Sequence, residues 1–137
     1  LRPGKTDEAI EVVKRENAVI ELEKEDYHYN NLKNENYIIA SMAQNSFMKE
    51  SEDLASLIQE QMSSTLKGIT NNRGVKQAGF HVLVGATMPN VLVEVGFLSN
   101  KKEANNLTKS YYRRNIAESI YKAIVEFKMK YEKPLLK

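Results

Sequence analysis

The sequence predicts an α/β fold, in which helices pack in layers against a small β-sheet. Apolar residues recur at helical intervals in the first half of the chain, two short β-branched runs follow, and helical spacing returns near the end. The resulting order is helix, helix, strand, strand, helix. The 137 residues are enough for one compact domain and too few for two well-formed ones.

The first predicted helix precedes a polar loop. Asp7 is suitably placed to cap a helix that runs from residue 8 to about residue 23, where apolar side chains form one stripe. Residues 24–35 are polar and rich in asparagine, and we expect a loop there.

The second helical region covers two stretches of helical spacing, residues 38–47 and residues 54–66. Ser51 either interrupts one long helix or lies on its surface. Gly68 is expected to end the helix in a left-handed cap, a conformation that glycine adopts without steric cost.

The middle of the chain contains two short runs rich in valine, residues 80–84 and 91–95. The residues between them form a connection short enough for neighbouring strands of one sheet. The second run is apolar on both alternating faces until Glu94, which favours a central strand covered on both sides.

Two helices are predicted to complete the fold. The sequence Ser-Asn-Lys-Lys-Glu, which begins at Ser99, is typical of a helix cap followed by an acidic residue in the first turn. A long final helix is expected from about Tyr111 to Tyr131, and Pro134 closes it. The residues expected on its apolar face are Ile116, Ile120, Ala123, Ile124 and Phe127.

Composition excludes several classes of function. The net charge is +2, from 20 basic and 18 acidic residues without a long basic block, so nothing favours nucleic acid as a partner. The chain has no cysteine, which excludes disulfides and cysteine-based metal sites or nucleophiles. No apolar run approaches the ~18 residues of a membrane span.

Glu94 is the strongest candidate for a functional residue. An unpaired carboxylate at the end of an apolar strand is costly to bury, and strand ends commonly line the ligand crevice of α/β sheets. Gly96 would let the backbone turn sharply or approach a ligand closely. The alternative interpretation is a structural Glu94 paired with Arg73 or Lys76.

Other candidate residues give weaker signals. His28 and His81 lack the spacing of a zinc site, which needs about three protein ligands. Ser99 and Ser119 have no evident histidine and aspartate support for nucleophilic catalysis. The sequence also lacks the glycine-rich phosphate-binding motifs.

Two segments resemble the hallmark segments of the zinc-dependent N-acetylmuramoyl-L-alanine amidases of the AmiC/CwlV kind. They are Arg73-Gly-Val-Lys-Gln-Ala-Gly-Phe-His-Val-Leu and Met88-Pro-Asn-Val-Leu-Val-Glu-Val-Gly-Phe-Leu-Ser-Asn. The resemblance covers residues 8 to about 127 and implies a mixed, mostly parallel sheet flanked by helices.

The resemblance also implies a function. Members of this family are peptidoglycan hydrolases, or autolysins, that cleave the amide between N-acetylmuramic acid and L-alanine of the stem peptide. Glu94 matches the catalytic glutamate of the motif V-E-x-G-F-x-S-N, which would take a proton from zinc-bound water and pass it towards the leaving amine. The implied location is the periplasm or cell envelope, in cell wall turnover.

The family's zinc ligands are missing from this sequence. They are a histidine in D-x-G-H-G-G, a glutamate, and a histidine in S-x-H-A-N, and neither motif occurs here. We therefore expect residues 1–137 to be the C-terminal portion of one N-terminally truncated catalytic domain, with the ligands upstream of Leu1. Alone, it is expected to bind no catalytic zinc and to be inactive, and its exposed sheet edge is expected to favour a dimer.

Residues 8–35 are similar to a regulatory insertion of some family members, which covers the active site and offers an acidic side chain to the zinc. Glu16 is the favoured autoinhibitory residue, while Glu21, Glu23 and Glu25 are further candidates. The alternative is a solvated helix face.

Two alternatives to an amidase fragment stay open. One is a non-catalytic remnant that binds peptidoglycan or an activator protein. The other is a different metallohydrolase of similar topology, such as a zinc exopeptidase. Cleavage of peptides that lack muramic acid would favour the exopeptidase.

Overall fold

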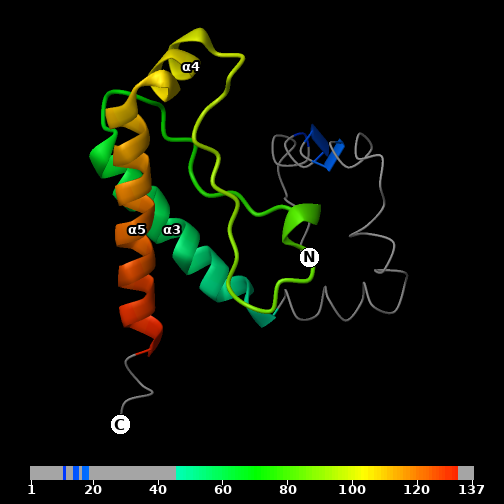
Figure 1. Cartoon of the computed structure of the whole chain (residues 1–137). Coiled ribbons are helices and arrows are strands. Elements are labelled where there is room, and N and C mark those ends of the chain that lie inside the picture. Colours follow the sequence, from blue (N-terminus) through cyan, green and yellow to red (C-terminus); the bar gives the residue numbers. More distant parts are fainter. Residues whose placement is uncertain (1–10, 12–13, 16, 19–45, 133–137) are drawn as a thin grey trace. The chain divides into compact units, whose positions relative to one another are not determined.

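The computed structural model describes residues 11, 14–15, 17–18 and 46–132 (Figure 1). In chain order, the elements are α3 (Met48–Thr65), the short 3-10 helix η2 (His81–Leu83), α4 (Lys101–Thr108) and α5 (Ser110–Glu132). The chain divides into two compact units, Leu1–Ser51 with Lys76–Asn90 and Glu52–Val75 with Val91–Lys137.

Only part of the N-terminal half is available to compare with the sequence predictions. Glu11, Lys14, Arg15 and Asn17 are helical, in agreement with a helix in that region. The rest of that predicted helix, the loop at 24–35 and residues 38–45 lie outside the described residues. The amide of Asn17 donates a hydrogen bond of 3.1 Å to the carbonyl oxygen of Gly79.

The predicted β-sheet is wrong for the part of the chain that the structure describes. Neither residues 80–84 nor residues 91–95 form a strand, so the mixed, mostly parallel sheet is not present there. The first run contains η2, and the second is an extended segment without regular structure. Valine-rich sequence favours extended backbone, but a strand also requires a neighbour that completes its hydrogen bonds.

Side-chain exposure in the second run shows why the central-strand interpretation failed. Val91, Val93 and Val95 are half-buried, whereas Leu92 is 39% exposed and Glu94 is exposed. The segment therefore buries one face only, and the apolar Leu92 misled the prediction of a second covered face. The dimer was expected to form through an exposed sheet edge, and the described residues contain no such edge.

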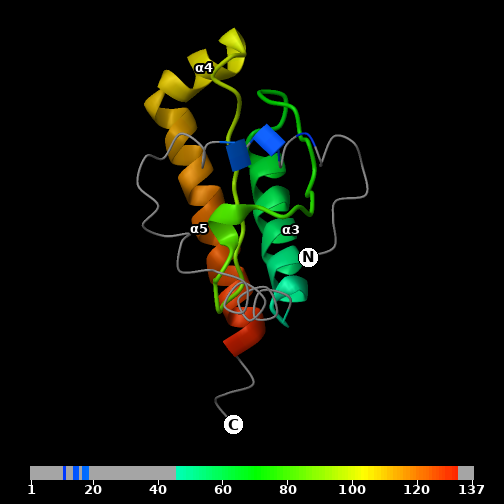
Figure 2. The same cartoon turned by 90° about the vertical axis from the view of Figure 1, so that its right-hand side faces the viewer.

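The second unit is built on α3 and α5, which lie side by side and run in opposite directions (Figure 2). Three side-chain contacts join them in antiparallel order: Thr65 with Ser119, Gln61 with Glu126, and Asp53 with Lys130. The bounds of α5 agree closely with the prediction for residues 111–131, whereas α3 ends near the predicted residue 66 but begins at Met48, before the predicted stretch 54–66. Gly68, just beyond α3, has the expected left-handed conformation with φ of +77°.

The core of this unit forms around Leu66, Tyr112 and Ile116, which are at most 5% exposed. Several half-buried residues pack against this cluster: Met62, Ile69, Val95, Leu107 and Ile120. Ala123 continues the buried face of α5, whereas Ile124 is 48% exposed and was wrongly placed on it. Each residue advances about 100° around a helix, which turns Ile124 away from the core.

Ser51 and Ser119 both prove to be helical residues whose hydroxyl groups are hydrogen-bonded. Ser51 lies within α3 and donates to the carbonyl oxygen of Phe47 at 2.7 Å. Ser119 is buried, and its Oγ lies 2.8 Å from the carbonyl oxygen of Asn115. Among the described helices, none combines the length and the apolar character required to cross a membrane.

Candidate functional site

Glu94 is an exposed residue of the extended segment that leads into α4. The next residue, Val95, packs against the core cluster around Tyr112. Successive side chains of an extended backbone point to opposite faces, so burial of Val95 directs Glu94 outwards. The segment thus presents an acidic side chain to solvent from a backbone that is fixed on the core.

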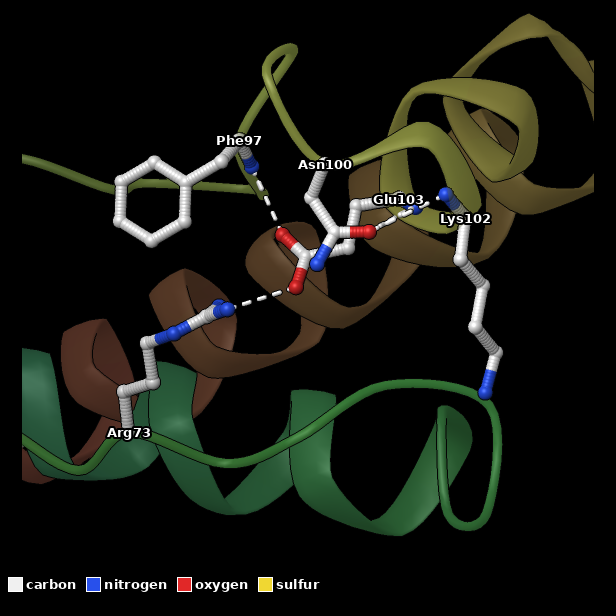
Figure 3. A network of polar contacts seen from close by, with 5 residues as sticks. All are labelled: Arg73, Phe97, Asn100, Lys102 and Glu103. Atoms are coloured by element: carbon white, nitrogen blue, oxygen red, sulfur yellow. Dashed lines mark hydrogen bonds and ion pairs between the residues drawn. The ribbon is translucent and has the colours of Figure 1, made fainter.

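A capped turn connects this segment to α4. The backbone N–H of Asn100 donates to the carbonyl oxygen of Phe97 at 3.1 Å. The side-chain Oδ1 of Asn100 accepts hydrogen bonds from the backbone N–H groups of Lys102 (3.0 Å) and Glu103 (3.3 Å), as Figure 3 shows. The helix cap predicted at this position is confirmed, with Asn100 as the N-cap residue.

Glu103 is buried and lies at the centre of a polar network (Figure 3). Its Oε2 accepts a hydrogen bond of 2.7 Å from the backbone N–H of Phe97, and its Oε1 lies 2.6 Å from Nη2 of Arg73. In a capping box, a glutamate at this position bonds back to the N–H of the N-cap residue. Here it reaches a residue before the cap, so the carboxylate joins the segment of Glu94 to the first turn of α4.

Arg73 closes the network from the loop that follows α3. Its guanidinium carbon lies 4.6 Å from the centroid of the Phe97 ring, within the range of a cation–π contact. The hydrogen bond from Arg73, followed by that from the Phe97 N–H, holds the pKa of the Glu103 carboxyl below its ordinary value of 4.5. The Glu103 carboxylate is therefore charged at neutral pH although only 10% of its side chain is exposed.

Gly96 gives this carboxylate the space that it needs. A Cβ atom on Gly96 would lie 3.1 Å from Oε2 of Glu103, and the φ of +145° is one that other residues rarely adopt. The sequence predicted that Gly96 allows a sharp turn of the backbone or a close approach to a ligand. The group that approaches is the side chain of Glu103.

The other sequence candidates belong to different parts of the chain. Arg73, considered as a partner for Glu94, is paired with Glu103. His81 belongs to η2 in the other unit, and His28 and Glu16 lie outside the described residues. Ser99 is exposed in the turn before α4.

Sequence reasoning identified the cap but missed the role of Glu103. The spacing from Asn100 to Glu103 signalled a capping box, in which the glutamate would remain within its own helix end. The contacts to Phe97 and Arg73 depend on how the loop after α3 packs, which local sequence does not specify.

The described residues do not fit a zinc site. A catalytic zinc ion needs about three histidine, aspartate, glutamate or cysteine ligands that converge on one point. No group of three such side chains is suitably placed in residues 46–132 or in the described positions before them.

A family profile and individual related proteins point to the same family. A family profile described as N-acetylmuramoyl-L-alanine amidase matches residues 5–126. The germination-specific N-acetylmuramoyl-L-alanine amidase of Bacillus subtilis is 37% identical over 78 residues, which are 57% of this chain and 32% of that protein. AmiC of Neisseria meningitidis, an N-acetylmuramoyl-L-alanine amidase, is 33% identical over 89 residues, or 65% of this chain and 21% of that protein.

Another relative matches a longer part of the chain at lower sequence identity. The probable cell wall amidase LytH of Staphylococcus saprophyticus is 25% identical over 127 residues, which are 82% of this chain and 44% of that protein. The chain thus spans less than half the length of these three relatives. No solved structure matches the chain. Because the family profile covers most of its residues, the chain belongs to the N-acetylmuramoyl-L-alanine amidase family.

Proposed function

We propose that this chain is part of a peptidoglycan hydrolase and that Glu94 is its general base. The bond cleaved is the amide between N-acetylmuramic acid and L-alanine of the stem peptide. The main support is the place of Glu94, an exposed acidic residue on a backbone held by the core and by α4. The names of two relatives, a germination-specific N-acetylmuramoyl-L-alanine amidase and a probable cell wall amidase, support the same reaction.

The proposed chemistry uses the ionised form of Glu94. The carboxylate accepts a proton from the water that attacks the amide carbonyl, and then donates this proton to the nitrogen of L-alanine as the C–N bond breaks. The products are a free carboxyl on the muramic acid and a free amine on the stem peptide.

Zinc is proposed only for the whole protein. The described residues offer no suitable ligand group, so the ligands would come from residues outside them. We likewise propose that residues 8–35 regulate the activity through Glu16, that an activator protein is a partner, and that the protein acts in the cell envelope. The Glu16 hypothesis predicts that Glu16→Ala raises basal activity.

The role of Glu94 is tested by Glu94→Gln in the whole protein. This change keeps the shape of the side chain and removes the proton-accepting carboxylate. We expect kcat for release of stem peptide from peptidoglycan to fall by about 10²- to 10⁴-fold. Glu118→Gln, at an exposed glutamate of α5, is the matched control and should retain the original kcat.

A Glu94→Gln variant that stays within a few-fold of the original kcat would rule out the general-base role. The second candidate function is binding of peptidoglycan without hydrolysis. It predicts that the whole protein sediments with peptidoglycan but releases no new L-alanine amine.

A further inference from the structure

We propose that Glu103 and Arg73 are positioning residues for Glu94, which they influence through the backbone at Phe97. This inference rests on the proposed role of Glu94 as general base. The observation that carries it is the hydrogen bond from the Phe97 N–H to the buried carboxylate of Glu103. Phe97 lies only three positions after Glu94, so the carboxylate holds the backbone close to the proposed base.

Both oxygens of Glu103 are used, which makes its carboxylate difficult to replace. Oε2 faces the N–H of Phe97 and Oε1 faces the guanidinium of Arg73, so both oxygens must accept hydrogen bonds. A glutamine side chain has only one acceptor oxygen, and its NH₂ group would face a donor at the other position. Glu103→Gln therefore removes one of the two contacts while the size of the side chain is unchanged.

The segment of Glu94 is fixed at two points on its C-terminal side. Val95 packs against the core cluster, and Phe97 is held by Glu103. Between them, Gly96 adopts a φ of +145° that sets the direction of the chain. Loss of the second point would let the backbone shift near Glu94, and displacement of a reacting group by ~1 Å can reduce the rate by about 10²-fold.

Arg73 contributes charge and orientation. Its guanidinium neutralises the buried carboxylate, so the hydrogen bond from Phe97 is charge-assisted, and the guanidinium carbon lies over the Phe97 ring, 4.6 Å from its centroid. Lysine at this position would keep the positive charge but could not make the same planar contact. Arg73→Lys is therefore a milder variant than Glu103→Gln.

The test combines a local measurement with kinetics, both in the whole protein. Hydrogen–deuterium exchange of the Phe97 amide, resolved by NMR, reports the contact itself. In Glu103→Gln we expect this exchange to become at least about tenfold faster. We expect kcat on a soluble muramoyl peptide to fall by about 10- to 100-fold while KM stays within about twofold, because the base and not the binding surface is displaced.

The matched control is Asp53→Asn, which removes the ion pair between Asp53 and Lys130 in the same unit. It tests the effect of losing an ion pair that joins α3 to α5. Its kcat should equal that of the original protein. Kinetic constants are expressed per folded molecule from circular dichroism, and Arg73→Lys replaces Glu103→Gln if the latter does not fold.

The double variant Glu94→Gln/Glu103→Gln decides whether Glu103 acts through Glu94. If it does, the double variant has the same kcat as Glu94→Gln alone. Normal kcat in Glu103→Gln, with faster exchange at Phe97, would overturn the positioning role and leave a structural contact. Normal kcat in Glu94→Gln would instead overturn the proposed function, and the positioning role with it, so the two failures are distinguishable.

Discussion

The backbone N–H of Phe97 donates its hydrogen bond to the side chain of Glu103, six residues further along the chain and on another element. Glu103 is 8% exposed and also paired with Arg73, so this single carboxylate joins the loop after α3, the segment of Glu94 and the first turn of α4. Its charge should therefore affect the stability of the whole unit.

The first prediction is a specific pH dependence of stability. The pKa of Glu103 is lowered in the folded protein by Arg73 and by the Phe97 N–H, from an ordinary value of 4.5. The folded state thus binds this proton more weakly than the unfolded state does. The contribution of Glu103 to the free energy of unfolding is present in full above pH 4.5 and is lost as the pH falls through the lowered pKa.

Denaturant unfolding at a series of pH values from about 6 down to about 3 measures how the free energy of unfolding changes with pH. On acidification, the free energy of unfolding of the original protein should fall faster than that of Glu103→Gln. The difference between the two free energies therefore becomes smaller as the pH falls. A difference that is constant over the whole range would show that the charge of Glu103 does not stabilise the fold.

How much of this arrangement the sequence predicts depends on the range of the contacts. The cap at Asn100 and the left-handed Gly68 were predicted correctly because each depends on neighbours within a few residues. The prediction of a sheet was wrong for the described residues, because pairing of strands depends on contacts between distant segments, which local sequence does not specify. Residues 91–95 have the pattern of a strand, but in the described residues no neighbour pairs with them.

In the candidate site too, local features could be predicted from the sequence and contacts between distant residues could not. Glu94 was identified from an acidic residue that interrupts an apolar run, a signal within the segment itself. The pairing of Arg73 with Glu103 joins positions 30 residues apart, and several charged residues of either sign were equally plausible partners. Ion pairs between long side chains depend on packing, so composition and spacing do not assign them.

The second prediction concerns Gly96. Gly96→Ala should lower the free energy of unfolding by about 1–3 kcal/mol, because alanine is strained at a φ of +145° and its methyl group would press on Glu103. Chemical denaturation measures this change. Gly74→Ala, where the added Cβ meets no atom within 4 Å, is the control for backbone strain alone. Equal losses in the two variants would contradict a specific contact with Glu103.

The third prediction tests the helical core. Ile116→Ala should cost about 2–5 kcal/mol, since this side chain is 5% exposed in the cluster with Leu66 and Tyr112. Ile124→Ala, on the same helix but 48% exposed, should cost less than about 1 kcal/mol. Thermal and denaturant unfolding of the two variants compare them directly. A larger loss at Ile124 would mean that this face of α5 is covered.

The fourth prediction concerns the cap of α4. Asn100→Ala removes the acceptor for the N–H groups of Lys102 and Glu103 and should destabilise the protein by about 1 kcal/mol. Asn105→Ala, at an exposed position inside α4, should be neutral or slightly stabilising, because alanine favours helix. Denaturant midpoints measure both changes, and a stabilising Asn100→Ala would contradict the capping role.

The fifth prediction is that residues 1–137 alone bind Zn²⁺ only weakly. Zinc requires about three converging ligands, and this sequence contains two histidines, no cysteine and, in the described residues, no group of three acidic or histidine side chains around one point. Isothermal titration calorimetry of the purified chain should therefore give no tight, stoichiometric binding. Addition of a chelator should leave its thermal unfolding midpoint unchanged, because a metal that does not bind the folded state cannot stabilise it. Tight binding of one zinc ion per chain would place a ligand set outside the described residues and within this sequence, and Glu16 and His28 would be the first positions to substitute.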